Sequence, residues 1–246
     1  MKISVVTVCY NAADLIEGTI RSVADQTYAD VEYIVIDGAS NDGTTDIIRR
    51  YSDSITYWIS EPDKGIYDAM NKGITAASGD YIIFMNAGDR FSDREVLANV
   101  APHLGKQTVV SGRWNRCYSN GSVKSAAPKP TESLKVEMPV CHQATFISLP
   151  YHKKHPFDTS FRLSADYNFF YHAWRNGETF SYIDETIVDF LEAEGASTDN
   201  ITTSVMEREK SWEGEKQLFL RKLNLKYQIC RIKTVKFLKS ITTYSK

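Results

Sequence analysis

The first 90 residues alternate short apolar strand-like runs with helical patterns, and this alternation constrains the fold more than any other feature. β-Rich runs occupy residues 3–8, 31–36, 55–59 and 81–85. Between them, apolar residues recur at helical spacing in residues 15–23, 45–51 and 66–77. Strands joined by helices favour right-handed crossovers and a parallel sheet. We therefore expect an α/β fold that binds its ligands at the carboxyl ends of the strands.

The second half has a more mixed pattern. Asn120-Gly121 separates two β-rich runs and predicts a hairpin turn. A strand is expected over residues 141–148, and a helix over 165–174 that stops at Asn176-Gly177. The sheet is therefore expected to be mixed but mostly parallel, with helices flanking it.

Composition excludes several classes of protein. Of the 246 residues, 42% are apolar and 24% charged, which is an ordinary globular mixture and excludes a disordered chain. No apolar run approaches the roughly 18 residues of a membrane-spanning helix. The four cysteines have no close spacing, and nothing resembles an export signal, so we expect free thiols in the cytoplasm.

Charge is unevenly distributed along the chain. Ten Lys and Arg against two Glu give residues 210–246 a charge of +8, whereas the preceding residues carry −10. An acidic body is a poor candidate for binding nucleic acid, and no nucleic-acid partner is expected. The basic tail is suited to an acidic surface.

Each of the four early strands ends in polar residues. The clusters are Tyr10-Asn11, residues 37–44, residues 61–65 and Asn86-Ala87-Gly88-Asp89. In a parallel sheet they would line one edge as a single acidic rim. No Gly-x-Gly-x-x-Gly follows the first strand and no P-loop motif occurs, which argues against a dinucleotide oxidoreductase and a P-loop enzyme.

Taken one at a time, these residues have simpler explanations. Asp37-Gly38 and Asp42-Gly43 suit turns for local reasons. Asp89 could cap a helix that begins near Ser92-Asp93, and Asp166 could be a first-turn acid that the helix dipole favours. The coincidence of four polar strand ends on one edge nevertheless favours a binding site.

These motifs carry a family resemblance. Residues 4–11, residues 35–44 and the strand ending in Asp89 resemble glycosyltransferases of family 2, which have the GT-A fold. The stretch over residues 60–73 is similar to the branch that builds bacterial surface polysaccharide, such as the colanic acid and O-antigen transferases. The resemblance extends over about residues 3–200, and it implies a Rossmann-like GT-A domain.

The resemblance implies a nucleotide-sugar donor, with UDP as the expected nucleotide. The residues assigned to the donor site are Thr7, Tyr10, Asn11, Asp37, Ser40, Asp42, Gly65, Asn71, Asn86, Ala87 and Gly88. Asp89 matches the last acid of the family's metal motif, so Mn²⁺ or Mg²⁺ is the expected cofactor. The motif has only one carboxylate here, and His142 is either a second metal ligand or an acceptor contact.

The resemblance assigns the role of catalytic base to Asp166. It would take a proton from the acceptor hydroxyl as that oxygen attacks the anomeric carbon, and a single displacement inverts the configuration. His142, Gln143, Arg162 and Ser164 are the residues assigned to the acceptor side by their position. The expected acceptor is a lipid-linked saccharide.

We expect two domains. Residues 1–205 would form the GT-A domain, with a nucleotide-sugar half (1–100) and an acceptor half (101–205), and residues 206–246 a basic amphipathic helical tail. Apolar residues of the tail recur at helical steps from Phe219 to Ile241. This stripe could pack on the domain, form a homodimer interface, or lie on a membrane surface.

Three functions remain open at this stage. An inverting hexosyltransferase in the cytoplasm, peripheral on the inner face of the membrane, agrees with all the motifs. A nucleotidyltransferase would need a Gly-rich phosphate loop that residues 7–11 lack. A non-catalytic relative that binds nucleotide-sugars is conceivable because the metal motif has lost a carboxylate.

Overall fold

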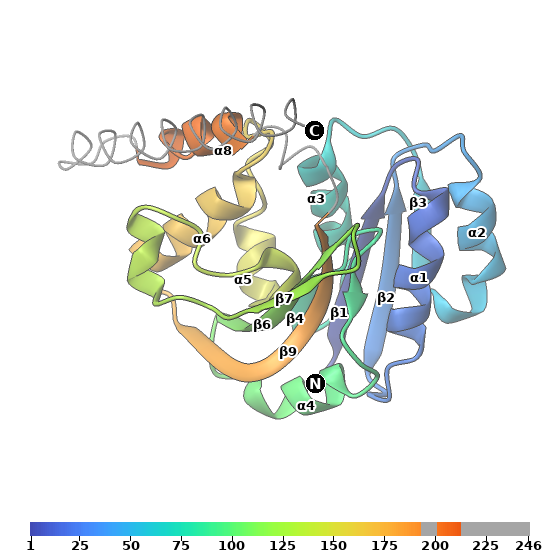
Figure 1. Ribbon diagram of the computed structural model, residues 1–246, viewed down its shortest axis with the longest axis horizontal. Coiled ribbons are helices and arrows are strands. Elements are labelled where there is room, and N and C mark those ends of the chain that lie inside the picture. Colours follow the sequence, from blue (N-terminus) through green and yellow to red (C-terminus); the bar gives the residue numbers. More distant parts are fainter. Residues whose placement is uncertain (193–200, 213–246) are drawn as a thin grey trace, which may run out of the picture.

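The computed structural model describes residues 1–192 and 201–212, which form a mixed sheet with helices on both faces (Figure 1). Its strands are β1 (Ile3–Cys9), β2 (Val31–Asp37), β3 (Tyr57–Ser60), β4 (Tyr81–Phe84), β5 (Arg90–Phe91), β6 (Val109–Tyr118), β7 (Val123–Ala126), β8 (Thr145–Ser148) and β9 (Phe180–Glu192). Its α-helices are α1 (Ala13–Ala24), α2 (Thr44–Arg50), α3 (Ile66–Ala76), α4 (Val96–Val100), α5 (Leu149–Lys154), α6 (Ala165–Arg175) and α8 (Ile201–Glu207). Short 3-10 helices include η3 (Thr131–Lys135), η4 (His142–Ala144) and η5 (Lys210–Trp212).

The sheet has the order β3-β2-β1-β4-β8-β6-β9-β5, and β7 pairs with β6. The first four strands are parallel, as the sequence predicted. β8 runs antiparallel to β4 and β6, whereas β6 and β9 are parallel to each other. The carboxyl ends of β1, β2 and β3 therefore lie along one edge, where Cys9 is beside Asp37 and Asp37 beside Ser60.

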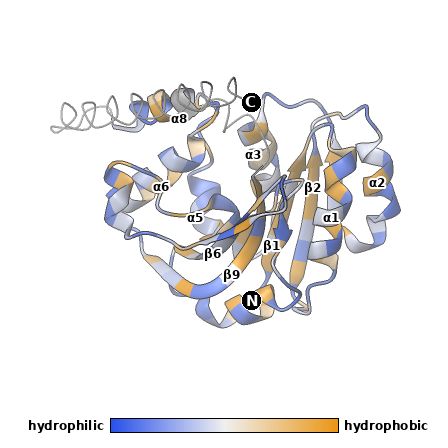
Figure 2. Ribbon diagram, viewed as in Figure 1, coloured by the Kyte–Doolittle hydropathy of each residue, from blue (hydrophilic) through white to orange (hydrophobic). Residues whose placement is uncertain are grey.

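Alternation along the strands produces two apolar cores, one on each face of the sheet. Val6 and Val8 of β1 pack with residues of α3, α5 and α6, whereas Ile3 and Val5 pack with residues of α1 and α4. Figure 2 shows the central strands as the most apolar part of the fold, with amphipathic helices around them. The two cores fix the strands and helices from which the loops at the carboxyl edge extend.

Two sequence predictions differ from the structure. The strand expected from residue 141 begins only at Thr145, because His142–Ala144 form a 3-10 turn in which Ala144 N donates to Cys141 O at 3.0 Å. Asp89 does not cap a helix, since the two-residue strand β5 follows it and α4 begins at Val96. The capping alternative for Asp89 is therefore wrong.

The domain boundary predicted between residues 205 and 206 falls inside α8. The chain continues to pack against α6 as far as Trp212, which is 1% exposed. The rest of the expected tail, with its stripe from Phe219 to Ile241 and Cys230, lies outside the described residues, as do the membrane and dimer alternatives that rest on it. Cys9, Cys117 and Cys141 are free thiols.

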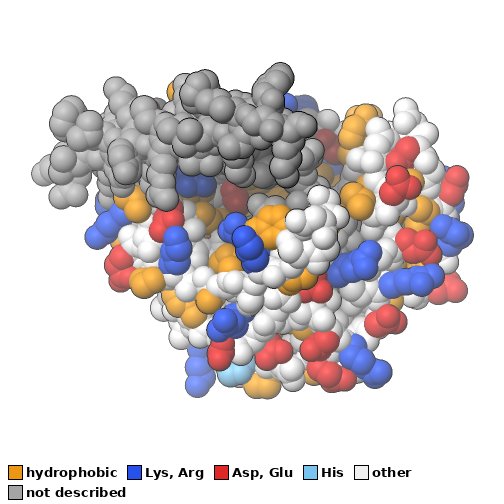
Figure 3. Space-filling model, viewed as in Figure 1, with side chains coloured by type: hydrophobic (Ala, Val, Ile, Leu, Met, Phe, Trp, Pro, Cys, Tyr) orange, Lys and Arg blue, Asp and Glu red, His pale blue; other side chains and the backbone are white. Residues whose placement is uncertain are grey.

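No helix in the described part of the chain is long and apolar enough to cross a membrane. On the face in Figure 3, acidic and basic side chains are interspersed over the described surface. The absence of a nucleic-acid partner stays a prediction.

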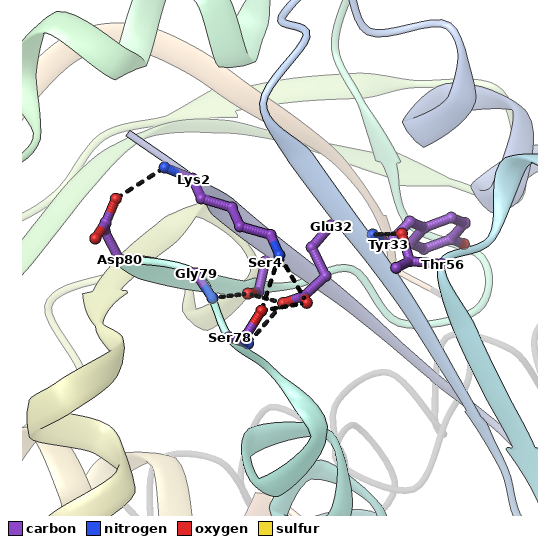
Figure 4. A network of polar contacts seen from close by, with 8 residues as sticks. All are labelled: Lys2, Ser4, Glu32, Tyr33, Thr56, Ser78, Gly79 and Asp80. Atoms are coloured by element: carbon purple, nitrogen blue, oxygen red, sulfur yellow. Dashed lines mark hydrogen bonds and ion pairs between the residues drawn. The ribbon is translucent and has the colours of Figure 1, made fainter.

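At the amino end of the sheet, opposite the polar rim, Glu32 is the centre of a buried polar network (Figure 4). Its carboxylate accepts hydrogen bonds from Ser4 Oγ at 2.6 Å, Ser78 N at 2.7 Å and Ser78 Oγ at 2.6 Å, and Lys2 Nζ lies 3.1 Å away. Burial works against the charged form, but the hydrogen bonds from Ser4, Ser78 and Lys2 outweigh it and lower the pKa of Glu32 to about 2. This network joins β1, β2 and the turn before β4.

Glu32→Gln is expected to lower the free energy of unfolding at pH 7 by about 1–3 kcal/mol, because charge-assisted hydrogen bonds are lost. A carboxyl whose pKa is lowered on folding stabilises the protein above its ordinary pKa of 4.5, and that stabilisation is lost as the pH falls toward 2. The difference between variant and wild type should therefore shrink between pH 5 and pH 2 in urea denaturation. The exposed Glu95→Gln serves as control, and an undiminished difference at low pH would contradict the assignment.

Candidate active site

The loops after β1 and β2 form one hydrogen-bonded unit. Asn11, whose backbone has φ 46°, donates its N–H to Ser40 Oγ at 2.8 Å and accepts from Asn41 N at 3.0 Å. Asp42 accepts from Ala13 N and from Thr44 N, both at 3.0 Å, so it caps the start of α1 from the neighbouring loop. The hydrogen bond from Thr44 N, two residues further along, confirms the local turn explanation given for Asp42. Its contact with the donor stays a prediction.

Asp37 ends β2 and is fully buried. Its carboxylate accepts hydrogen bonds from Ser40 N at 2.9 Å, Ser40 Oγ at 2.5 Å and Ser60 Oγ at 2.6 Å. Thr7 is also fully buried, and its hydroxyl pairs with that of Tyr33 at 3.0 Å. Asp37 therefore fixes the loop, and direct contacts of Asp37 and Thr7 with a donor stay predictions.

The exposed part of this edge is formed by Tyr10 and Asp63. Tyr10 is 64% exposed. Between these side chains lies Gly38, where a Cβ would collide with the Asp63 carboxylate and come within 3.3 Å of the Tyr10 ring. An aromatic face beside a carboxylate is suited to a nucleobase that stacks and donates an N–H. Asp63 was absent from the predicted donor residues, although it lies in the motif over residues 60–73.

Two further residues predicted for the donor site organise α3. Gly65, with φ 123°, precedes the helix and donates its N–H to Asp63 Oδ1 at 2.8 Å. Asn71 Nδ2 donates to Phe157 O, and Asn71 Oδ1 accepts from Phe157 N, both at 2.9 Å. Asn71 therefore ties the donor half to the acceptor half, and its donor contact stays a prediction.

The loop of Asn86, Ala87, Gly88 and Asp89 follows β4 and is fixed to α1. Thr19 Oγ1 accepts from Gly88 N at 2.9 Å and donates to Asp89 O at 2.8 Å. The Asp89 side chain accepts from Leu191 N at 3.1 Å and from the side chain of Gln143. Burial raises the pKa of Asp89 to about 7, against the effect of these two hydrogen bonds.

The described residues contain no group of three His, Cys, Asp or Glu side chains that could hold a metal ion. Asp89 nevertheless fits a site of the kind in which one carboxylate shares a cation with substrate phosphates. The side-chain oxygen of Asn86 is buried and has no hydrogen-bond partner among the described residues, so it offers a second hard ligand atom. A carboxylate and an amide oxygen are ligands of the kind that Mg²⁺ and Mn²⁺ prefer, and a metal held by them stays a prediction.

Asp166 opens into a pocket of about 330 Å³ at the start of α6. Its Oδ1 accepts from Tyr67 Oη at 3.0 Å and from Tyr167 N at 2.8 Å, whereas Oδ2 has no partner within the described residues. Burial and the charge of Asp166 raise the pKa of Tyr67 well above its usual range, so the phenol remains a donor. The first-turn position predicted for Asp166 is confirmed. One carboxylate oxygen remains available for a substrate proton.

His142 and Gln143 line the same pocket. The His142 ring lies 5.1 Å from Phe84 and 5.5 Å from Phe157, and burial lowers its pKa, although the charge of Asp166 opposes this. Gln143 also donates a hydrogen bond to Asp89, so one residue of the pocket that Asp166 lines is in contact with Asp89. Both alternatives for His142, an acceptor contact and ligation of a metal, stay predictions.

Arg162 and Ser164 precede Asp166, and the structure uses both for positioning. The Ser164 hydroxyl lies 2.9 Å from Ser204 O and 2.8 Å from Ser204 Oγ, and Glu207 accepts from Arg162 N at 3.0 Å and Leu163 N at 2.8 Å. α8 therefore fixes the backbone just before Asp166. Sequence reasoning missed α8, and only the polar composition of residues 203–212 hinted at a role other than packing.

The model of the family described as Glycosyl transferase family 2 matches residues 4–167. The chain belongs to this family. An uncharacterized glycosyltransferase of Mycobacterium tuberculosis is 36% identical over 174 residues, which cover 68% of this chain and 66% of that protein. The chain thus spans just under two thirds of that relative. The fold of this family 2 member is the GT-A fold predicted from the sequence.

Two solved structures support the fold. TarS of Staphylococcus aureus, residues 1–349 in complex with UDP-GlcNAc, has a TM-score of 0.72 at 17% identity and covers 93% of this chain and 73% of its own. The mannosyltransferase PcManGT of Pyrobaculum calidifontis, in complex with GDP-Man and Mn²⁺, has a TM-score of 0.61 at 20% identity, with coverages of 85% and 61%. At these levels of sequence identity, both similarities show the fold alone.

Proposed function

We propose that this family 2 member is an inverting glycosyltransferase. It transfers a sugar, expected to be a hexose, from a UDP-sugar to a lipid-linked saccharide acceptor of a bacterial surface polysaccharide. The observation that carries this proposal is that Asp166 and Gln143 line one pocket, and that the Gln143 side chain also bonds to Asp89. The likeness of residues 60–73 to the polysaccharide branch supports the acceptor class, and the UDP-sugar bound to TarS supports the donor class.

In the proposed reaction, Asp166 Oδ2 accepts the proton of the acceptor hydroxyl as its oxygen forms a bond to the anomeric carbon. The bond from that carbon to the diphosphate oxygen breaks, and the electron pair leaves with the nucleoside diphosphate. Tyr67 and the N–H of Tyr167 hold the carboxylate in place through Oδ1. Attack on the face opposite the leaving group inverts the configuration.

Asp89 and Asn86 would hold a divalent cation through their side-chain oxygens. When bound, the cation neutralises negative charge on the leaving diphosphate. Tyr10 would stack on the nucleobase, with Asp63 beside it. The cytoplasm, at the inner face of the membrane, is the proposed location, since nucleotide-sugars are made there and the expected acceptor is lipid-linked.

A thermal-shift panel of UDP-, GDP-, CMP- and dTDP-sugars, with and without Mn²⁺, tests the donor site. At about 100 times its dissociation constant, a ligand adds about 2.7 kcal/mol to stability. In a chain of this size, that raises the melting temperature by about 5–10 °C. We expect one nucleotide class to do so. No shift with any of the four would contradict the proposal.

Asp89→Asn is expected to abolish the part of this shift that depends on Mn²⁺, because the only carboxylate of the proposed site is lost. The melting temperature without ligand should not fall, since an amide can still accept from Leu191 N. Asp93→Asn, four residues further along in an exposed turn, is the matched control. An unchanged Mn²⁺ effect in Asp89→Asn would remove the metal from the proposal and leave Asp166 unaffected.

A further inference from the structure

The pocket beside Asp166 includes one residue, Arg208, that lies outside the family motifs. Strand β6, the segment 137–143, α6 and β9 supply most of the pocket wall, and Arg208 completes it from the turn after α8. Arg208 lies 66 and 65 residues beyond His142 and Gln143, the pocket residues of the acceptor motifs. The contacts of Ser204 and Glu207 with the residues before Asp166 hold this turn in place.

The guanidinium of Arg208 has unused donor capacity. Its Cζ lies 5.2 Å from the centre of the Tyr167 ring, and its Nε is buried without a hydrogen-bond partner. No carboxylate of the described residues forms an ion pair with it. A buried N–H without an acceptor is costly, so such groups in folded proteins generally meet a ligand or water. Nε2 of His142, which lines the same pocket and is 6% exposed, is also buried without a partner.

The acids that face this pocket make their hydrogen bonds with residues other than Arg208, and only Asp166 Oδ2 has no partner among the described residues. Glu137 accepts two hydrogen bonds from Lys129 Nζ at 2.8 Å, and Asp166 accepts from Tyr67 and Tyr167. Arg116 adds a second positive charge to the wall. None of the described acids pairs with Arg208, and a ligand with several anionic oxygens would supply the acceptor that its Nε–H lacks.

We propose that Arg208 binds a phosphate group of a substrate beside the catalytic base. This inference rests on the proposed function and narrows the chemistry of its substrates. A guanidinium donates parallel hydrogen bonds that match phosphate oxygens, and its charge strengthens them. The phosphate has two sources with the same chemistry: a phosphate ester of the acceptor saccharide, or the diphosphate that leaves with the nucleoside.

NMR of the full chain labelled with ¹⁵N at arginine Nε tests this inference. The Nε–H signal that disappears in Arg208→Gln belongs to Arg208. The probes are N-acetylglucosamine 1-phosphate for the acceptor, UDP and GDP with Mg²⁺ for the leaving group, and methyl N-acetylglucosaminide as the neutral control. A saturable shift of this signal with a phosphorylated probe, and none with the neutral one, supports the inference, and the probe that acts identifies the source.

Arg208→Gln is expected to weaken binding of the active probe by about ten- to hundred-fold, the size of a charge-assisted hydrogen bond. Lys210→Gln is the matched control, because Lys210 lies in the same segment over the Phe161 ring and outside the pocket. Equal weakening in both variants would overturn the inference, as would an Arg208 signal that no phosphorylated probe shifts. If that signal stays unshifted while a nucleotide-sugar still raises the melting temperature, the inference fails and the proposed function stands.

Discussion

Asp166→Asn is expected to lower turnover by about 10²–10⁴-fold, the usual contribution of a positioned general base. The amide oxygen can still accept from Tyr67 and Tyr167, so the variant should keep the fold of the pocket. It cannot accept a proton from the acceptor hydroxyl. Donor binding should be unchanged, because the loops that carry Tyr10 and Asp63 lie at the ends of other strands.

Release of nucleoside diphosphate, measured with acceptor and donor at saturation, gives the turnover, and the thermal shift with donor gives the binding. Tyr67→Phe is an informative companion, since it removes one hydrogen bond to Asp166 Oδ1 and should cost less than the loss of the base itself. Wild-type turnover in Asp166→Asn would show that another group takes the proton. A lost donor shift would place Asp166 in the donor site.

Trp212→Ala is expected to lower the free energy of unfolding by about 3–5 kcal/mol, the usual cost of truncating a buried Trp. Trp212 is 1% exposed and its Nε1 donates to the Tyr167 hydroxyl at 2.9 Å. That tyrosine follows Asp166 directly, so the variant also loosens the start of α6. Turnover should fall together with stability.

Urea denaturation of three variants separates packing from the hydrogen bond. Trp212→Phe keeps most of the buried ring and should lose about 1 kcal/mol with the N–H donor. Met206→Ala, at an exposed position of α8, should stay within about 0.5 kcal/mol of wild type. If Trp212→Ala behaved like Met206→Ala, residues 206–212 would not belong to the catalytic domain.

The sequence predicted the sheet edge well because strand ends are visible in it. Asp37, Asp89 and Asp166 each follow a pattern that fixes their place: the end of β2, the turn after β4 and the first turn of α6. Hydrophobic periodicity locates such positions, and parallel pairing brings the ends of β1, β2 and β3 to a common edge. The family motifs then supply the roles.

The hydrogen-bond partners of individual polar side chains could not be predicted from the sequence. Asn71 bonds to the backbone of Phe157 and Ser164 to Ser204, which the sequence did not indicate, and the substrate contacts assigned to both stay predictions. Residue type and position do not reveal the partner, because an amide or a hydroxyl can bond to a ligand or to the backbone equally well. Only the three-dimensional neighbours distinguish the two roles.

The contribution of α8 was invisible for a different reason. Trp212 and Glu207 act on α6 across some 40 residues of sequence, and neither belongs to a periodic pattern. The basic charge of residues 210–246 suggested a separate tail, and the predicted boundary lay between residues 205 and 206. In the structure Glu207 and Trp212 nevertheless contact residues at the start of α6 and just before it.

The late position of this segment has a consequence for synthesis of the protein. A ribosome delivers the chain from its amino end, and early parts generally fold first. The strands that carry the donor loops emerge long before Glu207 and Trp212, which hold the backbone around the base. A nascent chain would therefore acquire an edge that can hold a nucleotide-sugar before it acquires an anchored base. The contacts that anchor Asp166 would then form only late in synthesis, once residue 212 has left the ribosome.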